Sequence, residues 1–278
     1  MKKIKGLFAI IAVVLLCSSC DPLETRQELK GATTMDKINS LVSVSAEVRN
    51  GKRSNYLLLK SDGLDALSSF DYGLGTYVGT NGRVQVVSRG DNTVVFTALN
   101  ADGTKLSKEF TVNVEELYDV APEWEMFCGN GSKVWTWDEQ ASAVWGNGGY
   151  LGNTAPGWWT VAAGDMDGQT PGEGAGATMT FSVKGSALVK NKTNGSAEEG
   201  SFAFDMSKQT LADGNIWAIG KLSTKGVSVL SGKQPNHGGG PVNEYDILKL
   251  TNTEMVLAWP EPGAGAWGTA WFWLFRAK

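Results

Sequence analysis

Short stretches in which apolar and polar residues alternate run through the chain from about residue 39 onward. In the first part of the chain they cover residues 41–48, 56–59, 83–87, 93–98 and 109–114. A period of two is typical of strands with one buried face. The pairs Asn50-Gly51, Asp62-Gly63, Asn81-Gly82 and Asp102-Gly103 lie between or beside them, and such pairs adopt the positive φ angles of tight turns. This part therefore predicts a small antiparallel sandwich.

The remainder of the chain shows the same pattern. Its predicted strands are residues 133–137, 158–161, 178–183, 201–204, 216–219, 245–250, 255–259 and 270–275. No long stretch with the 3.6-residue period of a helix follows the first twenty residues. The chain is therefore expected to be all-β, and this part fits either a jelly-roll sandwich or an up-and-down barrel of lipocalin type. The order of the predicted hairpins does not distinguish the jelly roll from the barrel.

Tryptophan divides the chain into two parts. All eleven tryptophans lie between Trp124 and Trp273. Such a change in composition indicates two cores, so we place a boundary near residues 118–122. We expect a domain at residues 39–118 and a larger one at residues 119–278. Trp135 with Trp137, and Trp271 with Trp273, are spaced to share one face of a strand and are expected in the core.

The N-terminal segment has the pattern of a signal peptide. Lys2, Lys3 and Lys5 precede an apolar run from Leu7 to Leu16, which is about half as long as the roughly 20 residues of a bilayer-spanning helix. Residues 1–19 are therefore expected to be removed. Leu16-Cys17-Ser18-Ser19-Cys20 resembles the lipobox of bacterial lipoproteins, although Cys17 stands where an aliphatic residue is usual. The resemblance implies that Cys20 is lipidated.

The segment that follows Cys20 is polar and is expected to act as a tether over residues 20–38. Asp21 and Glu24 resemble the acidic signal that some Gram-negative lipoproteins use to reach the cell surface, which implies an outer-membrane, surface-exposed location. Removing residues 1–19 takes away three lysines and no acid, so the formal charge moves from −4 to −7. Because the mature chain is acidic, it is not expected to bind nucleic acid. Cys128 has no second cysteine left to pair with.

One motif in the first domain suggests a family. Phe70-Asp71-Tyr72-Gly73-Leu74-Gly75 resembles the Trp-Asp-Phe-Gly-Asp-Gly signature of PKD domains, and residues 92–98 with Asp102-Gly103 fit the strands that follow it. The resemblance implies an Ig-like sandwich that serves as a spacer or weak binding module. Leu74 replaces the usual acid, which argues against an ion at this turn.

Aromatic residues in glycine-rich stretches are the candidate binding residues. Loops lie at the surface and carry function, and an exposed indole can stack on the C–H face of a sugar while amides and carboxylates bind its hydroxyls. Trp158 and Trp159 face opposite ways in a strand, so at most one of them is expected in a site. The candidate rings are Trp145, Tyr150, Trp158, Trp159 and Trp267, and the candidate polar residues are Asn147, Asn153, Asp165 and Glu261.

The order of these parts resembles the surface glycan-binding lipoproteins of bacterial polysaccharide-utilisation systems. The resemblance rests on the lipobox, the PKD-like domain, and the motifs Lys133-Val134-Trp135-Thr136-Trp137-Asp138 and Val144-Trp145-Gly146-Asn147-Gly148-Gly149-Tyr150. It implies capture of an extracellular polysaccharide without cleavage, beside other components of a glycan-uptake complex.

Other functions remain open at this stage. A glycoside hydrolase needs two carboxylates, for which Asp138, Asp165, Asp167, Glu173 and Glu261 are available. An adhesion or assembly protein is a further alternative. The single histidine, His237, and the thiol of Cys128 have no neighbours in sequence that predict nucleophilic catalysis. Asp165, Asp167 and Glu173 together offer oxygen ligands for Ca²⁺; no other cofactor is expected.

Overall fold

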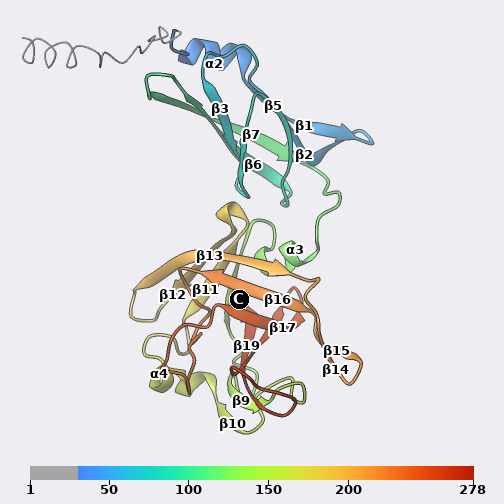
Figure 1. The fold of residues 1–278 in the computed structure, drawn as a ribbon, viewed down its shortest axis with the longest axis vertical. Coiled ribbons are helices and arrows are strands. Elements are labelled where there is room, and N and C mark those ends of the chain that lie inside the picture. The colour runs from blue at the N-terminus through green and yellow to red at the C-terminus, as the bar shows by residue number, and fades with distance from the viewer. Residues whose placement is uncertain (1–30) are drawn as a thin grey trace, which may run out of the picture.

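The fold is that of a computed structural model, which describes residues 31–278. The predicted signal peptide and Cys20 lie outside the described residues. Two β-domains follow one another along the chain (Figure 1), and the strands in both are antiparallel, as expected. Within residues 31–278, none of the helices has the length and apolar character that crossing a bilayer requires.

The N-terminal domain is a sandwich of two sheets. One sheet has the order β1-β2-β5 and the other has the order β4-β3-β6-β7. The bounds are β1 (Ser43–Arg49), β2 (Lys52–Lys60), β3 (Leu67–Asp71), β4 (Thr76–Val78), β5 (Asn81–Gln85), β6 (Gly90–Leu99) and β7 (Lys105–Val114). Alternate residues of these strands fill the core, where the rings of Phe70 and Phe96 lie 4.9 Å apart.

Two turns and one helix of this domain test the sequence signals. Asn50 and Gly51 both have positive φ between β1 and β2, as predicted. Asn81-Gly82 instead begins β5. The helix α2 (Met35–Leu41) was not expected: Thr34 caps its N-terminus and Ile38 is buried against the sandwich. The packed domain therefore begins before residue 39, because a single apolar residue in a polar segment anchors this helix.

The C-terminal domain is an eight-stranded barrel. Its strands are β8 (Ser132–Trp137), β11 (Thr178–Ser182), β12 (Ala187–Asn191), β13 (Ala197–Asp205), β16 (Gly220–Lys225), β17 (Glu244–Leu250), β18 (Glu254–Pro260) and β19 (Thr269–Ala277). They pair in this order, and β19 closes the barrel on β8 through the pair Phe275 and Trp137. Each strand pairs with the next barrel strand along the chain, which makes this an up-and-down barrel and not a jelly roll.

Large side chains fill the barrel. Trp135, Trp137, Trp273 and Phe275 are at most 1% exposed, so the paired tryptophans of β8 and β19 lie in the core as predicted. The short helix α3 (Glu123–Cys128) packs against β8 and β11, and the carbonyl of Phe127 accepts a hydrogen bond from Trp135 Nε1. The carbonyls of Glu173 and Ser231 accept in the same way from Trp137 and Trp273, so these indole N–H groups are satisfied inside the barrel.

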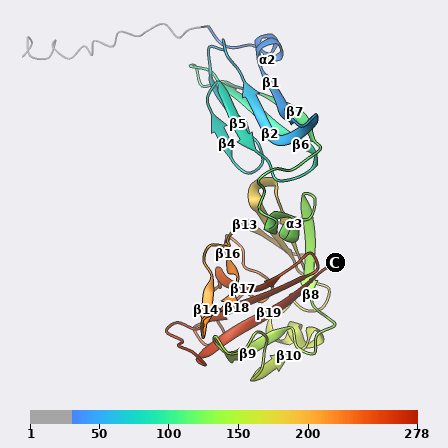
Figure 2. The same ribbon diagram turned by 90° about the vertical axis from the view of Figure 1, so that its right-hand side faces the viewer.

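Three further elements are attached to the barrel. β9 (Trp145–Gly149) pairs with the N-terminal half of β19, and β10 (Trp159–Val161) pairs with β9. Both lie at the end of the barrel farthest from the N-terminal domain (Figures 1 and 2). The hairpin of β14 (Thr210–Ala212) and β15 (Asn215–Ala218) contributes to a small apolar cluster on the outer side of β18 and β19. The helix α4 (Met166–Gln169) follows a 3-10 turn, Ala163–Asp165.

The two domains touch at the PKD-like turn. Gly185 donates a backbone hydrogen bond to the carbonyl of Gly73, and Leu74 packs against the hydrophobic core of the barrel. The departure from the acidic residue at position 74 thus coincides with an apolar contact between the domains.

Candidate functional site

Four strands form an open sheet at the far rim of the barrel, in the order β10-β9-β19-β18. One cross-strand row on this sheet consists of Trp159, Asn147, Trp271 and Trp259, each directly opposite the next. Residues directly opposite one another point to the same face of a sheet. We refer to this row, together with Trp267, as the aromatic face.

Two buried indoles support one exposed indole in this row. The ring of Trp145 lies 5.0 Å from Trp271 and 5.6 Å from Trp159, and Trp159 lies 5.9 Å from Trp271. Trp145 and Trp271 are 1% and 4% exposed, whereas Trp159 is 43% exposed. Aromatic pairs at these separations contribute about 0.5–1.5 kcal/mol each beyond area burial. The cluster therefore holds the Trp159 ring against the core while leaving part of it in solvent.

Trp267 is the most exposed indole of the face. It is 64% exposed, and its backbone has the unusual φ of 61°. The backbone N–H of Trp267 donates to the backbone carbonyl of Tyr150. A Cβ added at Gly149 or at Gly152 would lie only 2.5 Å or 2.7 Å from the indole, so the ring rests directly on glycine backbone. Trp159 lies opposite Asn147 on the neighbouring strand, and Gly149, which contacts Trp267, is two residues along β9 from Asn147 on the same face.

Polar groups lie beside these rings. Glu261 Oε1 accepts hydrogen bonds from Trp271 Nε1 at 3.0 Å and from Asn236 Nδ2 at 2.6 Å, and its Oε2 lies 3.4 Å from His237 Nε2. Burial raises the pKa of this carboxyl, but the hydrogen bonds from Trp271, Asn236 and His237 outweigh it and hold the pKa below its usual value. The Asn147 side-chain oxygen accepts from the backbone of Trp159 at 3.0 Å.

Some predicted site residues have other surroundings. The expectation that Trp145 is exposed in a loop is wrong, because it lies in β9 and is buried. Tyr150 is half-buried on the other side of the sheet, edge-on to Trp217 at 5.1 Å. The side-chain oxygen of Asn153 accepts a hydrogen bond from the Gly149 backbone. Trp158 is 54% exposed and lies in the bend just before β10, outside the paired row that carries Trp159.

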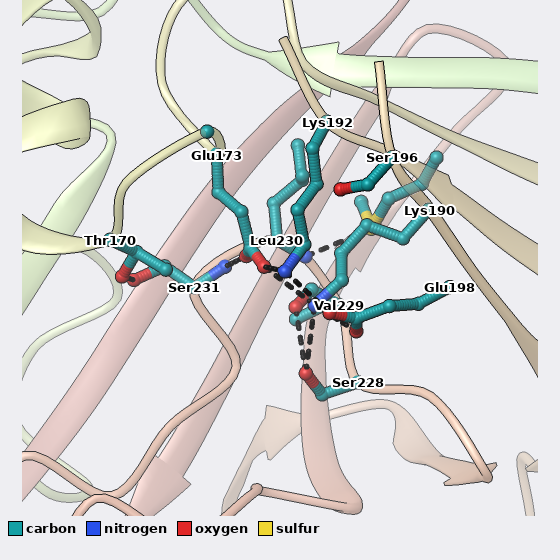
Figure 3. A network of polar contacts seen from close by, with 12 residues as sticks. Thr170, Glu173, Lys190, Lys192, Ser196, Glu198, Ser228, Val229, Leu230 and Ser231 are labelled. Carbon is teal, nitrogen blue, oxygen red and sulfur yellow. Dashed lines mark hydrogen bonds and ion pairs between the residues drawn. The ribbon is translucent and has the colours of Figure 1, made fainter. Parts of the chain in front are cut away.

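The acidic residues considered for Ca²⁺ do not converge. Glu173 is buried in the barrel, where Oε1 lies 2.8 Å from Lys190 Nζ and Oε2 accepts a hydrogen bond from the Ser231 backbone (Figure 3). Asp167 Oδ1 instead accepts from the backbone of Gly172 and Gly174. Within the part of the chain that the structure describes, no three His, Cys, Asp or Glu residues gather as a metal site would need.

Glu173 belongs to a four-residue ion network. Lys190 is 3% exposed and contacts both Glu173 and Glu198, each at 2.8 Å, while Lys192 also reaches both carboxylates (Figure 3). Because Glu173 also holds the Ser231 backbone, the network ties the segment after α4 to the loop after β16. It thereby closes the barrel interior and leaves Glu173 engaged with cations.

The other groups considered for catalysis have structural partners. Asp138 forms an ion pair with Arg276 at 2.8 Å. Cys128 is buried, and burial raises the pKa of its thiol to about 12, so it is not an activated nucleophile. His237 lies in its loop, 38% exposed at the side chain, near Glu261 and Trp259.

Two hollows among the described residues lie away from the aromatic face. One of about 290 Å³ is lined by Asp71, Leu74 and Lys184 at the junction of the domains, and one of about 370 Å³ lies beside Gln140 and Arg276. On the aromatic face, Trp159 and Trp267 are 43% and 64% exposed, so both rings are open to solvent.

Four residues proposed from sequence come together on this face: Asn147, Trp159, Trp267 and Glu261. Trp271 was assigned only to the core, and its second role as a hydrogen-bond donor to Glu261 follows from a register that alternation does not give. Asn236 carried no signal of its own. The chain matches no protein-family model, and no curated protein is significantly similar to it.

Proposed function

We propose that this chain is a non-catalytic glycan-binding lipoprotein, anchored to the outer membrane through Cys20, that captures extracellular polysaccharide on its aromatic face. Trp159 and Trp267 supply stacking surfaces, and Asn147 and Glu261 supply hydrogen-bonding groups between and beside them. In this proposal the N-terminal sandwich acts as a spacer that holds the barrel away from the membrane.

The observation that supports the proposal most is the placement of two exposed indoles on one sheet face. Residues paired across antiparallel strands lie about 5 Å apart, and residues two apart along a strand lie roughly 7 Å apart. The backbones of Trp159 and of Gly149, on which the Trp267 ring rests, are therefore separated by about 8 Å. That span is longer than a single pyranose ring, so it suits an oligosaccharide segment.

The rigidity of both rings supports the same proposal. Trp159 packs on two buried indoles and Trp267 rests on glycine backbone, so little side-chain entropy remains to be lost when a ligand covers them. Preorganisation of this kind raises affinity by lowering the cost of binding. An exposed ring without a ligand would instead leave apolar surface in water for no structural gain.

Affinity electrophoresis tests the proposal directly. Soluble protein comprising residues 21–278 is run through gels that contain plant, host or microbial polysaccharides. At least one polysaccharide should retard the protein, and Trp267→Ala and Trp159→Ala should each reduce the retardation. Trp158→Ala is the matched control and should leave retardation unchanged, since it removes an indole whose exposure, 54%, lies between those of Trp159 and Trp267 but which precedes β10 and is outside the paired row. Free migration of the folded protein across a broad panel would refute the proposal.

A further inference from the structure

The segments that build the aromatic face contain no cationic side chain. Residues 134–183 include β9 and β10, and residues 250–275 include β18 and most of β19; neither segment has a single lysine or arginine. The same two segments carry seven acidic residues: Asp138, Glu139, Asp165, Asp167, Glu173, Glu254 and Glu261. Asp138, Glu173 and Glu254 are ion-paired with cations from outside these two segments. Glu261, by contrast, accepts a hydrogen bond from Trp271 of the aromatic face.

The neighbouring loop after β16 brings one lysine and the single histidine near the face. Lys233 Nζ donates to the carbonyl of Gln169 and lies 5.5 Å from the ring centre of Trp145, which is buried. His237 faces Glu261 at 3.4 Å. Both groups thus already have partners, and the cation of Lys233 packs on a buried ring of the cluster.

Glu261 gives the face its charge. Its hydrogen bonds from Trp271 and Asn236 favour the ionised carboxylate, as the direction of its pKa indicates. The carboxylate accepts hydrogen bonds and can accept one more from a sugar hydroxyl. It has no arginine or lysine beside it among the described residues to offset an approaching anion.

We infer that the aromatic face selects glycans whose bound rings are uncharged, and that it discriminates against uronates and sulfated or phosphorylated sugars. This inference rests on the proposed function. Carboxylates and sulfates are bound in proteins by charge-assisted hydrogen bonds, most often from arginine. The segments of this face contain no arginine, and Lys233 and His237 beside it are already engaged with Gln169 and Glu261. An anionic ring placed over Trp159 or Trp267 would instead meet Glu261, and like-charge contacts oppose binding.

Matched polymer pairs test the inference. The soluble chain is run in gels containing neutral polymers (xyloglucan, mannan, hydroxyethyl cellulose, dextran) or anionic ones (polygalacturonate, chondroitin sulfate, carboxymethyl cellulose, dextran sulfate). Hydroxyethyl cellulose with carboxymethyl cellulose, and dextran with dextran sulfate, are the matched pairs; for xyloglucan and mannan the anionic partner is the same polymer with its primary hydroxyls oxidised to carboxylates. Retardation is expected from at least one neutral polymer, and the apparent affinity for its anionic partner should be lower by at least about tenfold. The loss should be smaller at about 0.2 M salt than at about 0.02 M, since salt screens exposed charges. Glu261→Gln keeps the shape of the side chain and removes its charge, so it should reduce the difference in affinity between neutral and anionic polymers severalfold.

The outcomes separate the two proposals. Preferential retardation by an anionic polymer, abolished by Trp267→Ala, would overturn the selectivity while supporting glycan binding at this face. A selectivity that Glu261→Gln leaves unchanged at both salt concentrations would also overturn it. Free migration in every gel, neutral and anionic, would overturn glycan binding itself.

Discussion

A methyl group added at Gly152 tests whether Trp267 acts as a fixed platform. The Cβ of Gly152→Ala would lie 2.7 Å from each of three ring carbons of Trp267, and these are its three nearest atoms. Gly152 does not have a positive φ, so alanine suits its backbone. Ordinary van der Waals contact begins at about 3.4 Å, so the indole of Trp267 must shift by roughly 0.7 Å or rotate away from the glycine backbone.

The expected effect is on binding more than on stability. Stacking of a planar base on an aromatic side chain contributes roughly 1–3 kcal/mol, and we place a sugar ring at the lower end, about 1 kcal/mol. Losing that contact would weaken glycan affinity about five- to tenfold. The free energy of unfolding should fall by less than about 1 kcal/mol, because the displaced side chain is already mostly in solvent.

Isothermal titration of wild type and variant with the retarding polysaccharide measures glycan affinity, and urea unfolding measures the free energy of unfolding. Gly265→Ala is the control, since Gly265 lies in the loop that carries Trp267 and a Cβ there would meet nothing within 4 Å. The reasoning fails if Gly152→Ala binds as tightly as wild type while Trp267→Ala does not. It also fails if Gly265→Ala weakens binding equally.

Three other substitutions give distinct results. Trp145→Ala should lower the free energy of unfolding by about 3–5 kcal/mol, measured by urea unfolding; a loss below 1 kcal/mol would contradict its place in the core. Lys190→Met should cost about 3–5 kcal/mol by leaving Glu173 partly uncompensated, and adding Glu173→Gln should recover part of the loss. Glu261 has a lowered pKa in the folded chain, so the stability that its carboxylate contributes is fully present above the unfolded pKa and is lost as pH falls through the folded pKa. The Tm difference between wild type and Glu261→Gln should therefore shrink in acid. A Tm difference that stays constant with pH would refute this.

The anchor has its own test in cells. Cys20→Ala should move the protein from the membrane to the soluble fraction, which fractionation and immunoblotting measure. Membrane retention of this variant would contradict lipidation at Cys20.

Alternation predicted most strands because each has one face in a core. Residues 133–137, 178–183 and 255–259 match β8, β11 and β18 to within one or two residues. The same signal failed at β9, where glycines at positions 146, 148 and 149 suggested an exposed loop. A Cβ at Gly146 would lie 2.1 Å from the carbonyl of Trp159. Glycine is required there because another backbone approaches closely, and not because the segment is exposed.

The composition of the loops pointed to Asn147, Trp159, Trp267 and Glu261, but not to their arrangement. Asn147 and Trp271 are paired across more than 120 residues of sequence. No local pattern encodes such a pairing, because barrel closure and the packing of the whole core decide the register. The position of Trp159 opposite Asn147 likewise became known only from the partner of β10.

The position of the aromatic face follows from how β19 is shared. Its C-terminal end pairs with β8 from Phe275 onward, and Trp273 and Phe275 are buried inside the barrel. Its N-terminal half pairs with β9 instead, so the same sheet face continues beyond the closed barrel toward the solvent. The rings that continue it, Trp159 and Trp267, are consequently attached to the core at one side and open at the other. A binding surface built in this way is as rigid as the barrel beneath it, and its affinity for a glycan would depend on buried residues such as Trp145 that the ligand never touches.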